Sequence, residues 1–210
     1  MEVTTPTGPA RVTLRCPAQA RGLVLLGHGA GGGVTAPDLV GCSAALVAAG
    51  VAVGLVEQPY RVAGRRVAAP AARLDEAWQA VVAELSSLVP GPLVVGGRSS
   101  GARVACRTAT TCAAVGVLAL SFPLVPPWRP DKPRDAELLG AGVPVLVVQG
   151  SRDAFGSAED VAAVVAGAGG PGLGIDVLAV PGADHGLGRP FDVAAVVGWV
   201  LARLAGEGVG

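Results

Sequence analysis

The sequence predicts one α/β domain that spans residues 1–210, with a mostly parallel sheet and helices on both of its faces. Short, continuous apolar runs such as 23–26 and 93–95 are typical of parallel strands that are buried on both sides. Segments with apolar residues at helical spacing lie between these runs, and this alternation indicates β-α-β units. A chain of 210 residues can bury the core of one such domain and is short for two.

The first third of the chain is expected to contain three strands, at 11–16, 23–26 and 51–56. Apolar and polar residues alternate in the first, which is typical of an edge strand with one wet face. The other two are apolar throughout, as expected for strands in the middle of a parallel sheet.

Two helices are expected to pack on these strands. Thr35 and Asp38 have the spacing of a capping box, so one helix is expected to begin there, and Gly50 ends it. The segment 58–66 is expected to be a loop. The second helix covers 71–89, where apolar residues recur every three or four positions and form one stripe. This stripe consists of Leu74, Trp78, Val81, Val82 and Leu85.

The second half of the chain repeats the same alternation of apolar runs and helical patterns. No stretch in it is long enough to form a large lid, although a proline-stiffened loop is expected at 122–130. One strand is expected to begin at Leu93, and three more are expected at 115–120, 143–149 and 175–180. A helix is expected to follow the strand at Leu93 and to end at about Thr110, and two more helices are expected at 157–166 and 191–204.

A G-x-S-x-G sequence, 97–101, lies at the junction between the strand that begins at Leu93 and the helix after it. In a nucleophile elbow, such a strand–turn–helix junction holds the serine hydroxyl above the sheet. Side chains at Gly97 or Gly101 would collide with the neighbouring strand or helix. The helix N-terminus beneath Ser99 favours negative charge that develops nearby. The motif alone is weak, because it also fits a plain Gly/Ser-rich turn.

Two later side chains make Ser99 a candidate nucleophile. Asp153 and His185 each follow a predicted strand, and the carboxyl ends of parallel strands meet at one edge of a sheet. The chain order Ser, Asp, His is the order that hydrolases built on an α/β sheet require. The histidine would take the serine proton, and the carboxylate would orient the histidine. We therefore predict that Ser99, Asp153 and His185 form a catalytic triad.

Other assignments of these residues remain open at this point. Asp153 could instead cap the following helix, and His185 could be a surface turn residue. Asp184 adjoins His185 and is badly placed to reach its ring, so we interpret it as a turn residue. Asp131 and Asp135 follow the preceding strand and are alternative acids for the triad.

The glycine-rich segment 27–33 is the expected source of an oxyanion-hole donor. We expect one donor to be the N–H of Ser100, next after the nucleophile, and the other to be the N–H of Ala30. The glycines allow the backbone to approach a substrate carbonyl closely. His28 is interpreted as a structural residue that holds this loop in place.

The same segment also fits a dinucleotide-binding pattern. Gly27, Gly29 and Gly32 match G-x-G-x-x-G, and Glu57 ends the next strand, where a ribose-binding acid would lie. That interpretation leaves Ser99, Asp153 and His185 unexplained, and a further strand precedes the glycine-rich one. We therefore expect no cofactor, and the chain has no P-loop sequence.

The composition excludes several partner classes. The formal net charge is zero and the arginines are scattered, so nucleic acid is not expected. The N-terminus lacks the features of a signal peptide, and no apolar run reaches about 18 residues, so we expect a soluble, cytoplasmic protein without a membrane span.

The sequence indicates no oligomeric state. No metal is expected, because the cysteines lack ligand spacing and are expected to be small buried residues: Cys16, Cys42, Cys106 and Cys112.

The chain resembles the α/β-hydrolase superfamily over essentially its whole length. The segments 96–106, 120–124 and 148–156 resemble more closely a small dienelactone-hydrolase-like group. This group includes testis-expressed protein 30 and the hydrolase-like part of subunit 3 of the non-specific-lethal histone acetyltransferase complex. The resemblance implies an α/β-hydrolase fold and the triad Ser99, Asp153 and His185. Serine stands where dienelactone hydrolase has cysteine, so that particular activity is not implied.

The predicted function is hydrolysis of a small-molecule carboxylic ester or thioester through an acyl-enzyme on Ser99. Four side chains near the strand ends could wall an acyl pocket or simply pack in the core: Phe122, Trp128, Phe155 and Leu187. The alternative is a non-catalytic interaction subunit on a hydrolase scaffold, as the resemblance allows. The complete triad argues against this alternative, because a scaffold has no physical need for all three groups.

Overall fold

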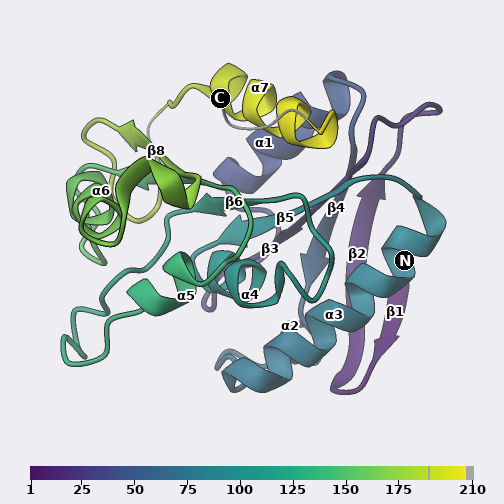
Figure 1. Ribbon diagram of the computed structural model, residues 1–210. Coiled ribbons are helices and arrows are strands. Elements are labelled where there is room, and N and C mark those ends of the chain that lie inside the picture. The colour runs from purple at the N-terminus through teal and green to yellow at the C-terminus, as the bar shows by residue number, and fades with distance from the viewer. Residues whose placement is uncertain (189, 207–210) are drawn as a thin grey trace.

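A computed structural model describes residues 1–188 and 190–206. Within them, eight strands form one sheet in the order β1-β2-β4-β3-β5-β6-β7-β8 (Figure 1). β1 and β2 form an antiparallel hairpin, β2 is antiparallel to β4, and all other neighbours are parallel. The strands are β1 (Glu2–Thr5), β2 (Gly8–Arg15), β3 (Leu23–Gly27), β4 (Ala52–Glu57), β5 (Leu93–Arg98), β6 (Gly116–Leu120), β7 (Val145–Gly150) and β8 (Ile175–Val180).

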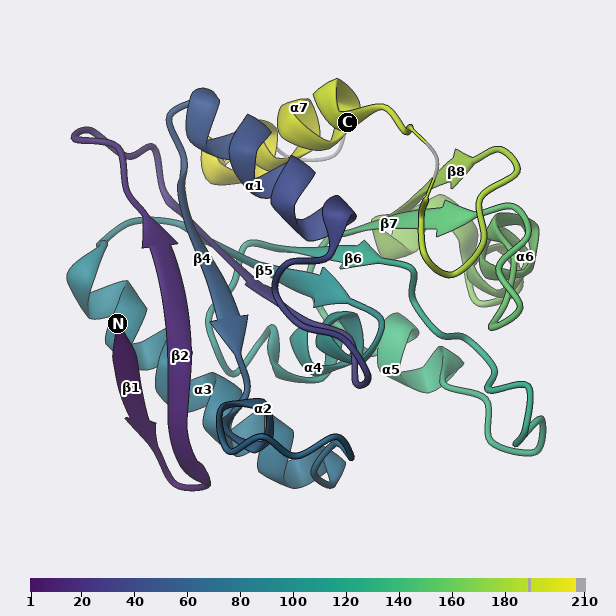
Figure 2. The ribbon, with the colours of Figure 1, turned by 180° about the vertical axis from the view of Figure 1, so that it is seen from behind.

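Helices cover both faces of this sheet. α1 (Pro37–Ala48) and α7 (Val193–Leu204) lie side by side on one face, as the opposite views of Figures 1 and 2 show. The other face carries α3 (Ala71–Leu88), α4 (Ser100–Thr108) and α6 (Ala158–Gly167). Three short elements lie in the connections: α2 (Pro59–Val62), α5 (Asp135–Leu139) and the 3-10 turn η1 (Gly170–Leu173).

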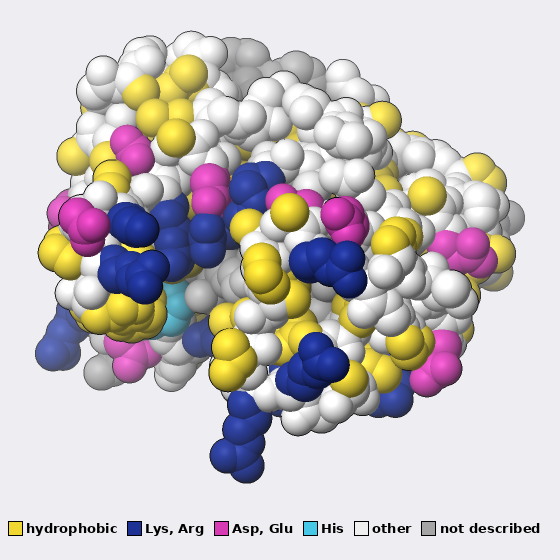
Figure 3. Space-filling model, turned by 90° about the horizontal axis from the view of Figure 1, so that it is seen from below, with side chains coloured by type: hydrophobic (Ala, Val, Ile, Leu, Met, Phe, Trp, Pro, Cys, Tyr) yellow, Lys and Arg dark blue, Asp and Glu magenta, His cyan; other side chains and the backbone are white. Residues whose placement is uncertain are grey.

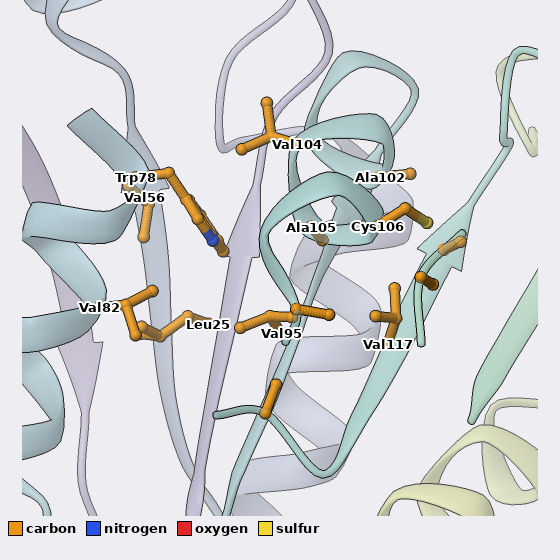
Figure 4. Packing of buried hydrophobic residues seen from close by; sticks show 14 of the residues in the cluster. Leu25, Val56, Trp78, Val82, Val95, Ala102, Val104, Ala105, Cys106 and Val117 are labelled. Atoms are coloured by element: carbon orange, nitrogen blue, oxygen red, sulfur yellow. The ribbon is translucent and has the colours of Figure 1, made fainter. Parts of the chain in front are cut away.

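The central strands are apolar because both of their faces are covered. Leu25 of β3 packs toward α3 and α4, whereas the adjacent Leu26 packs toward α1 and α7. Trp78 and Val82 bring the predicted stripe of α3 against Leu25, and Figure 4 shows this contact beside the packing of α4 on the sheet. The prediction of a mostly parallel sheet with helices on both faces and no large lid is confirmed.

The N-terminal region differs from the expectation. The predicted strand 11–16 is part of β2, which is not at the edge, because the unpredicted β1 covers its outer side. Gly8 turns the chain with a φ of 117°, and the Thr5 hydroxyl donates a hydrogen bond of 2.6 Å to the Gly8 carbonyl. A strand as short as β1 leaves too brief an alternation to be recognised.

Helix positions also correct three expectations. The predicted capping box at the start of α1 is wrong: Ala36 is the N-cap without a side-chain cap, and Thr35 lies outside the helix. The segment 58–66 is not all loop, because it contains α2, and α5 was not expected. Helices of four or five residues are too short to produce a periodic pattern.

The cysteines follow the expectation only in part. Cys42 and Cys106 are buried, Cys112 is half-buried, and Cys16 is exposed. Burial raises the pKa of both Cys42 and Cys106 to about 12, so these thiols are protonated and inert at neutral pH. No group of three or more His, Cys, Asp and Glu side chains in the described parts of the chain could hold a metal ion. None of the described helices is both long and apolar enough to cross a membrane.

Candidate active site

Ser99 lies at a strained corner between β5 and α4. Its φ of 52° and ψ of −108° are unusual for a residue with a side chain. The corner packs directly on the end of β3: a Cβ atom on Gly101 would come within 2.5 Å of the Gly27 carbonyl group, and one on Gly97 would strike the Gly27 carbonyl oxygen. The two glycines of the motif are therefore required by close backbone packing, as expected.

The side chains of Ser99, His185 and Asp153 form one hydrogen-bonded chain. The Ser99 hydroxyl lies 3.0 Å from Nε2 of His185, and Nδ1 of the same ring lies 2.8 Å from Oδ2 of Asp153. With Nδ1–H donating to the carboxylate, Nε2 is free to accept the serine proton. Three segments that are distant in the sequence thus meet at the carboxyl edge of the sheet.

Neighbouring groups fix the carboxylate and the ring. Asp153 is buried, and its Oδ1 accepts a hydrogen bond of 2.8 Å from the Phe155 N–H. Gln149, at the end of β7, donates from Nε2 to Oδ2 of Asp153 at 3.0 Å. The Phe155 ring stacks on the His185 ring with centroids 4.2 Å apart. These contacts leave the carboxylate little freedom to turn away from the histidine.

The alternative assignments for the acidic residues do not fit this geometry. Ser157, not Asp153, caps α6 through a capping box with Asp160. Asp184 accepts a hydrogen bond of 2.8 Å from the Gly186 N–H, which makes it a turn residue. Asp135 begins α5.

Ala30, which is expected to be an oxyanion donor, lies in the loop after β3. Ala30 and Ser100 line the same pocket as Ser99. None of the described residues accepts a hydrogen bond from the Ala30 N–H, and the Ser100 N–H belongs to the first turn of α4, where the backbone has no intrahelical acceptor. The Tyr60 hydroxyl donates to the Ala30 carbonyl at 2.9 Å and so fixes the orientation of this loop.

His28 holds the base of the loop in place. Its Nε2 accepts a hydrogen bond of 3.1 Å from the Gln58 N–H, so the proton is on Nδ1, which donates to the Gly29 carbonyl at 2.8 Å. The ring is buried, and this burial lowers the pKa of His28. The neutral ring is the form that fits both bonds. These contacts agree with the interpretation of His28 as a structural residue.

Arg98, inside the elbow motif, links the histidine loop to α1. Its Nη2 donates to the His185 carbonyl at 2.8 Å. Its Nε lies 3.0 Å from Oδ2 of Asp38, an ion-pair distance without hydrogen-bond alignment. Burial raises the pKa of Asp38, although the charge of Arg98 acts in the opposite direction. Asp38, expected as a capping acid, thus serves as the counter-ion of Arg98.

A family model described as an alpha/beta hydrolase domain matches residues 20–193, which include the elbow, Asp153 and His185. The chain belongs to the α/β-hydrolase family. This confirms the superfamily resemblance, whereas the closer resemblance to the group of testis-expressed protein 30 stays a prediction. None of the curated proteins matches this sequence.

Solved structures of α/β hydrolases share the fold over nearly the whole chain. XC6422 from Xanthomonas campestris, described as an a/b serine hydrolase without lid, is 18% identical, with a TM-score of 0.73 over 99% of this chain and 93% of that one. Est1E from Butyrivibrio proteoclasticus is 16% identical, with a TM-score of 0.80 over 98% of both chains. A dienelactone hydrolase from Anabaena variabilis is 18% identical, with a TM-score of 0.70 over 98% of this chain and 95% of that one.

In this α/β hydrolase, Ser99 and His185 open into a pocket of about 550 Å³. Figure 3 shows a histidine side chain beside a hollow, with side chains in the colour of Lys and Arg around it and Asp and Glu side chains among them. Trp128 and Phe155 line the pocket, with ring centroids 5.3 Å apart in an edge-to-face arrangement. Phe122 and Leu187 do not line it. Both are buried, Phe122 in the core beneath α4 and Leu187 in the core beneath α7. These two residues therefore pack in the core and do not form the wall of an acyl pocket.

The dinucleotide interpretation is not supported by this arrangement. Glu57, its candidate ribose-binding acid, lies 3.3 Å from the Arg11 guanidinium on the adjacent strand β2. The alpha/beta hydrolase family model also covers the glycine-rich segment 27–33.

Sequence reasoning missed several groups that shape the site. Tyr60, Arg98 and Gln149 act through long-range contacts, which no local pattern reveals. Arg103 and Arg107 carried a usable signal, because they lie four residues apart on the helix that follows Ser99 and therefore share one face of it.

Proposed function

We propose that the chain is a serine hydrolase that cleaves carboxylic esters or thioesters of small molecules through a Ser99 acyl-enzyme. The observation that carries the proposal is the continuous hydrogen-bonded chain from Ser99 through His185 to Asp153, beside an accessible pocket. The site is reached without a lid, which favours small, soluble esters over long-chain lipids.

The first half-reaction forms the acyl-enzyme. Oγ of Ser99 attacks the substrate carbonyl carbon while Nε2 of His185 takes the hydroxyl proton. The carbonyl oxygen becomes an oxyanion, which the Ala30 and Ser100 N–H groups stabilise; one such donor is typically worth about 3 kcal/mol of the barrier. The tetrahedral intermediate then expels the alcohol or thiol, which receives the proton from His185.

The second half-reaction releases the acid. A water molecule gives a proton to His185 and attacks the acyl carbon, and the new tetrahedral intermediate expels Ser99 as its proton returns from the imidazole. Asp153 keeps its negative charge throughout, orients the ring and stabilises the imidazolium. The enzyme ends each cycle in its starting protonation state.

The test is covalent labelling by a fluorophosphonate probe, combined with hydrolysis of p-nitrophenyl esters of increasing chain length. We expect the folded protein to be labelled, Ser99→Ala not to be labelled, and the variant to lose at least about a thousandfold in kcat/KM. Ser87→Ala is the matched control, because Ser87 is exposed on α3. A folded protein that is neither labelled nor active would contradict the proposal and favour an interaction subunit on a hydrolase scaffold.

A further inference from the structure

Four arginine side chains line the candidate active-site pocket. Arg98, Arg103, Arg107 and Arg134 all line it, and no Asp or Glu among residues 1–188 and 190–206 does. A pocket lined by charges of one sign attracts ligands of the opposite sign, because its low-dielectric walls concentrate the field.

Three of these arginines already have carboxylate partners behind the pocket surface. Arg103 donates to Glu137 from Nε at 2.8 Å and from Nη2 at 2.5 Å. Arg107 donates to Asp75 at 2.6 Å and to Glu137 at 2.8 Å. Burial alone would raise the pKa of Glu137, but the hydrogen bonds and charges of these two arginines outweigh it and lower that pKa. Glu137 is therefore a fixed anion shared by two guanidinium groups.

Arg134 is different, because its guanidinium forms no ion pair and no hydrogen bond with any residue in the described parts of the chain. Its position is nevertheless set by the backbone, since the Arg134 N–H donates to the Leu124 carbonyl at 2.8 Å. The next residue along, Val125, donates to the Phe155 carbonyl at 2.8 Å. Arg134 is thus connected, through the backbone of Leu124 and Val125, to the backbone of Phe155, whose ring stacks on His185.

The surroundings of Arg134 disfavour an unpaired cation. The side chain is half-buried, and this burial, followed by repulsion from Arg103, lowers the pKa of Arg134. An arginine nonetheless remains charged near neutral pH. A ligand anion would relieve both effects, because it would replace lost hydration and screen the repulsion between the two guanidinium groups.

The arginine side chains of the pocket lie within reach of a substrate held at Ser99. The Arg103 N–H donates to the Ser99 carbonyl, so Arg103 lies one helical turn from the nucleophile, about 6 Å along the axis of α4. Arg134 lines the same pocket as Ser99, so a substrate attacked at Ser99 can present an anionic group to Arg134.

We propose that Arg134 binds an anionic group of the substrate, a carboxylate or a phosphate, so that the enzyme acts on negatively charged esters in preference to neutral ones. This inference rests on the proposed function, because the anion is a part of the ester that Ser99 attacks. A planar guanidinium suits both groups, since each can accept two hydrogen bonds from it.

The test compares each charged ester with its neutral methyl ester. Mono-p-nitrophenyl glutarate places the charge on the acyl side, and para-acetoxybenzoate places it on the alcohol side. We expect the native protein to prefer the charged member of at least one pair. Arg134→Gln should reduce that preference, measured as the ratio of kcat/KM for the charged ester to kcat/KM for the neutral ester, by about tenfold through KM for the charged ester. Arg134→Lys should restore part of the preference. Arg129→Gln, an exposed arginine on the same loop that does not line the pocket, should change nothing.

Competition identifies the anion. Glutarate and phenyl phosphate are compared as inhibitors of neutral-ester hydrolysis by the native protein and by Arg134→Gln. The stronger inhibitor of the native protein indicates the preferred anionic group, and its inhibition should weaken in Arg134→Gln. Equal ratios of charged to neutral hydrolysis in the native protein and in Arg134→Gln would overturn this inference while the proposed function stands. A folded native protein that hydrolyses none of the four esters would instead count against the proposed function.

Discussion

His28 shows how one buried side chain makes the stability of the fold sensitive to pH. The ring is neutral in the folded chain because Nε2 accepts from the Gln58 N–H, and burial lowers its pKa. In the unfolded chain the same group has a pKa of about 6.5. Below that value the unfolded state binds a proton that the folded state does not, so stability falls as the pH falls.

We expect the free energy of unfolding to fall by up to about 1.4 kcal/mol per pH unit from this residue, starting at about pH 6.5 and continuing down to the lowered folded pKa. His28→Gln keeps an acceptor for the Gln58 N–H but does not titrate, so its stability should depend less on pH below about 6.5. Urea unfolding at several pH values measures both slopes. Every other titratable group is common to the two proteins, so parallel slopes would show that the folded state does not resist protonation of His28.

At the scale of single residues, the sequence was informative where chemistry restricts the choice of residue type. Ser99, Asp153 and His185 could be identified because an elbow motif and the order of strand ends constrain them, and the structure brings them within hydrogen-bond distance. Arg98 and Gln149 could not, because an arginine or glutamine has many structural uses and its partner is known only once the chain has folded.

At the scale of elements, the unpredicted helix α2 positions the loop that follows β3. It carries Tyr60, whose hydroxyl donates to the Ala30 carbonyl, and Gln58 at its N-cap, whose N–H donates to His28. The long helix α3 was predictable from its stripe, whereas α2 has only four residues and no periodicity. Its sequence gives no reason to expect that it supports the loop that follows the neighbouring strand β3.

Tyr60→Phe tests this support. The ring remains and the hydroxyl is lost, so the Ala30 peptide gains freedom to turn away from the oxyanion. We expect kcat for p-nitrophenyl esters to fall by about tenfold with little change in KM, because the lost interaction orients a transition-state donor. Stability should fall by only about 1 kcal/mol, which thermal unfolding measures. A loss of stability with kcat intact would assign the hydroxyl a purely structural role.

At the scale of the whole molecule, the central sheet separates two cores and holds the candidate catalytic groups at the carboxyl ends of its strands. The core beneath α3 and α4 and the core beneath α1 and α7 share the strands β3, β4 and β5. A loss of packing on one face should therefore be transmitted to the strand ends that carry the site. The apolar runs indicated this two-sided burial, and the stripe of α3 indicated that Trp78 lies inside it.

Two tryptophans offer a matched comparison of packing and function. Trp78 is 1% exposed beneath the elbow, whereas Trp128 is 70% exposed and lines the pocket. Trp78→Ala should cost about 3–5 kcal/mol of unfolding free energy, because it leaves a cavity between α3 and β3. Trp128→Ala should change stability by less than about 0.5 kcal/mol and act instead on KM for esters with bulky acyl groups. Urea unfolding followed by circular dichroism and by esterase activity measures both quantities.

If the two cores form one cooperative unit, the circular dichroism signal and the esterase activity of Trp78→Ala will be lost at the same urea concentration. Loss of activity well before loss of secondary structure would show that the site edge unfolds independently of the sheet.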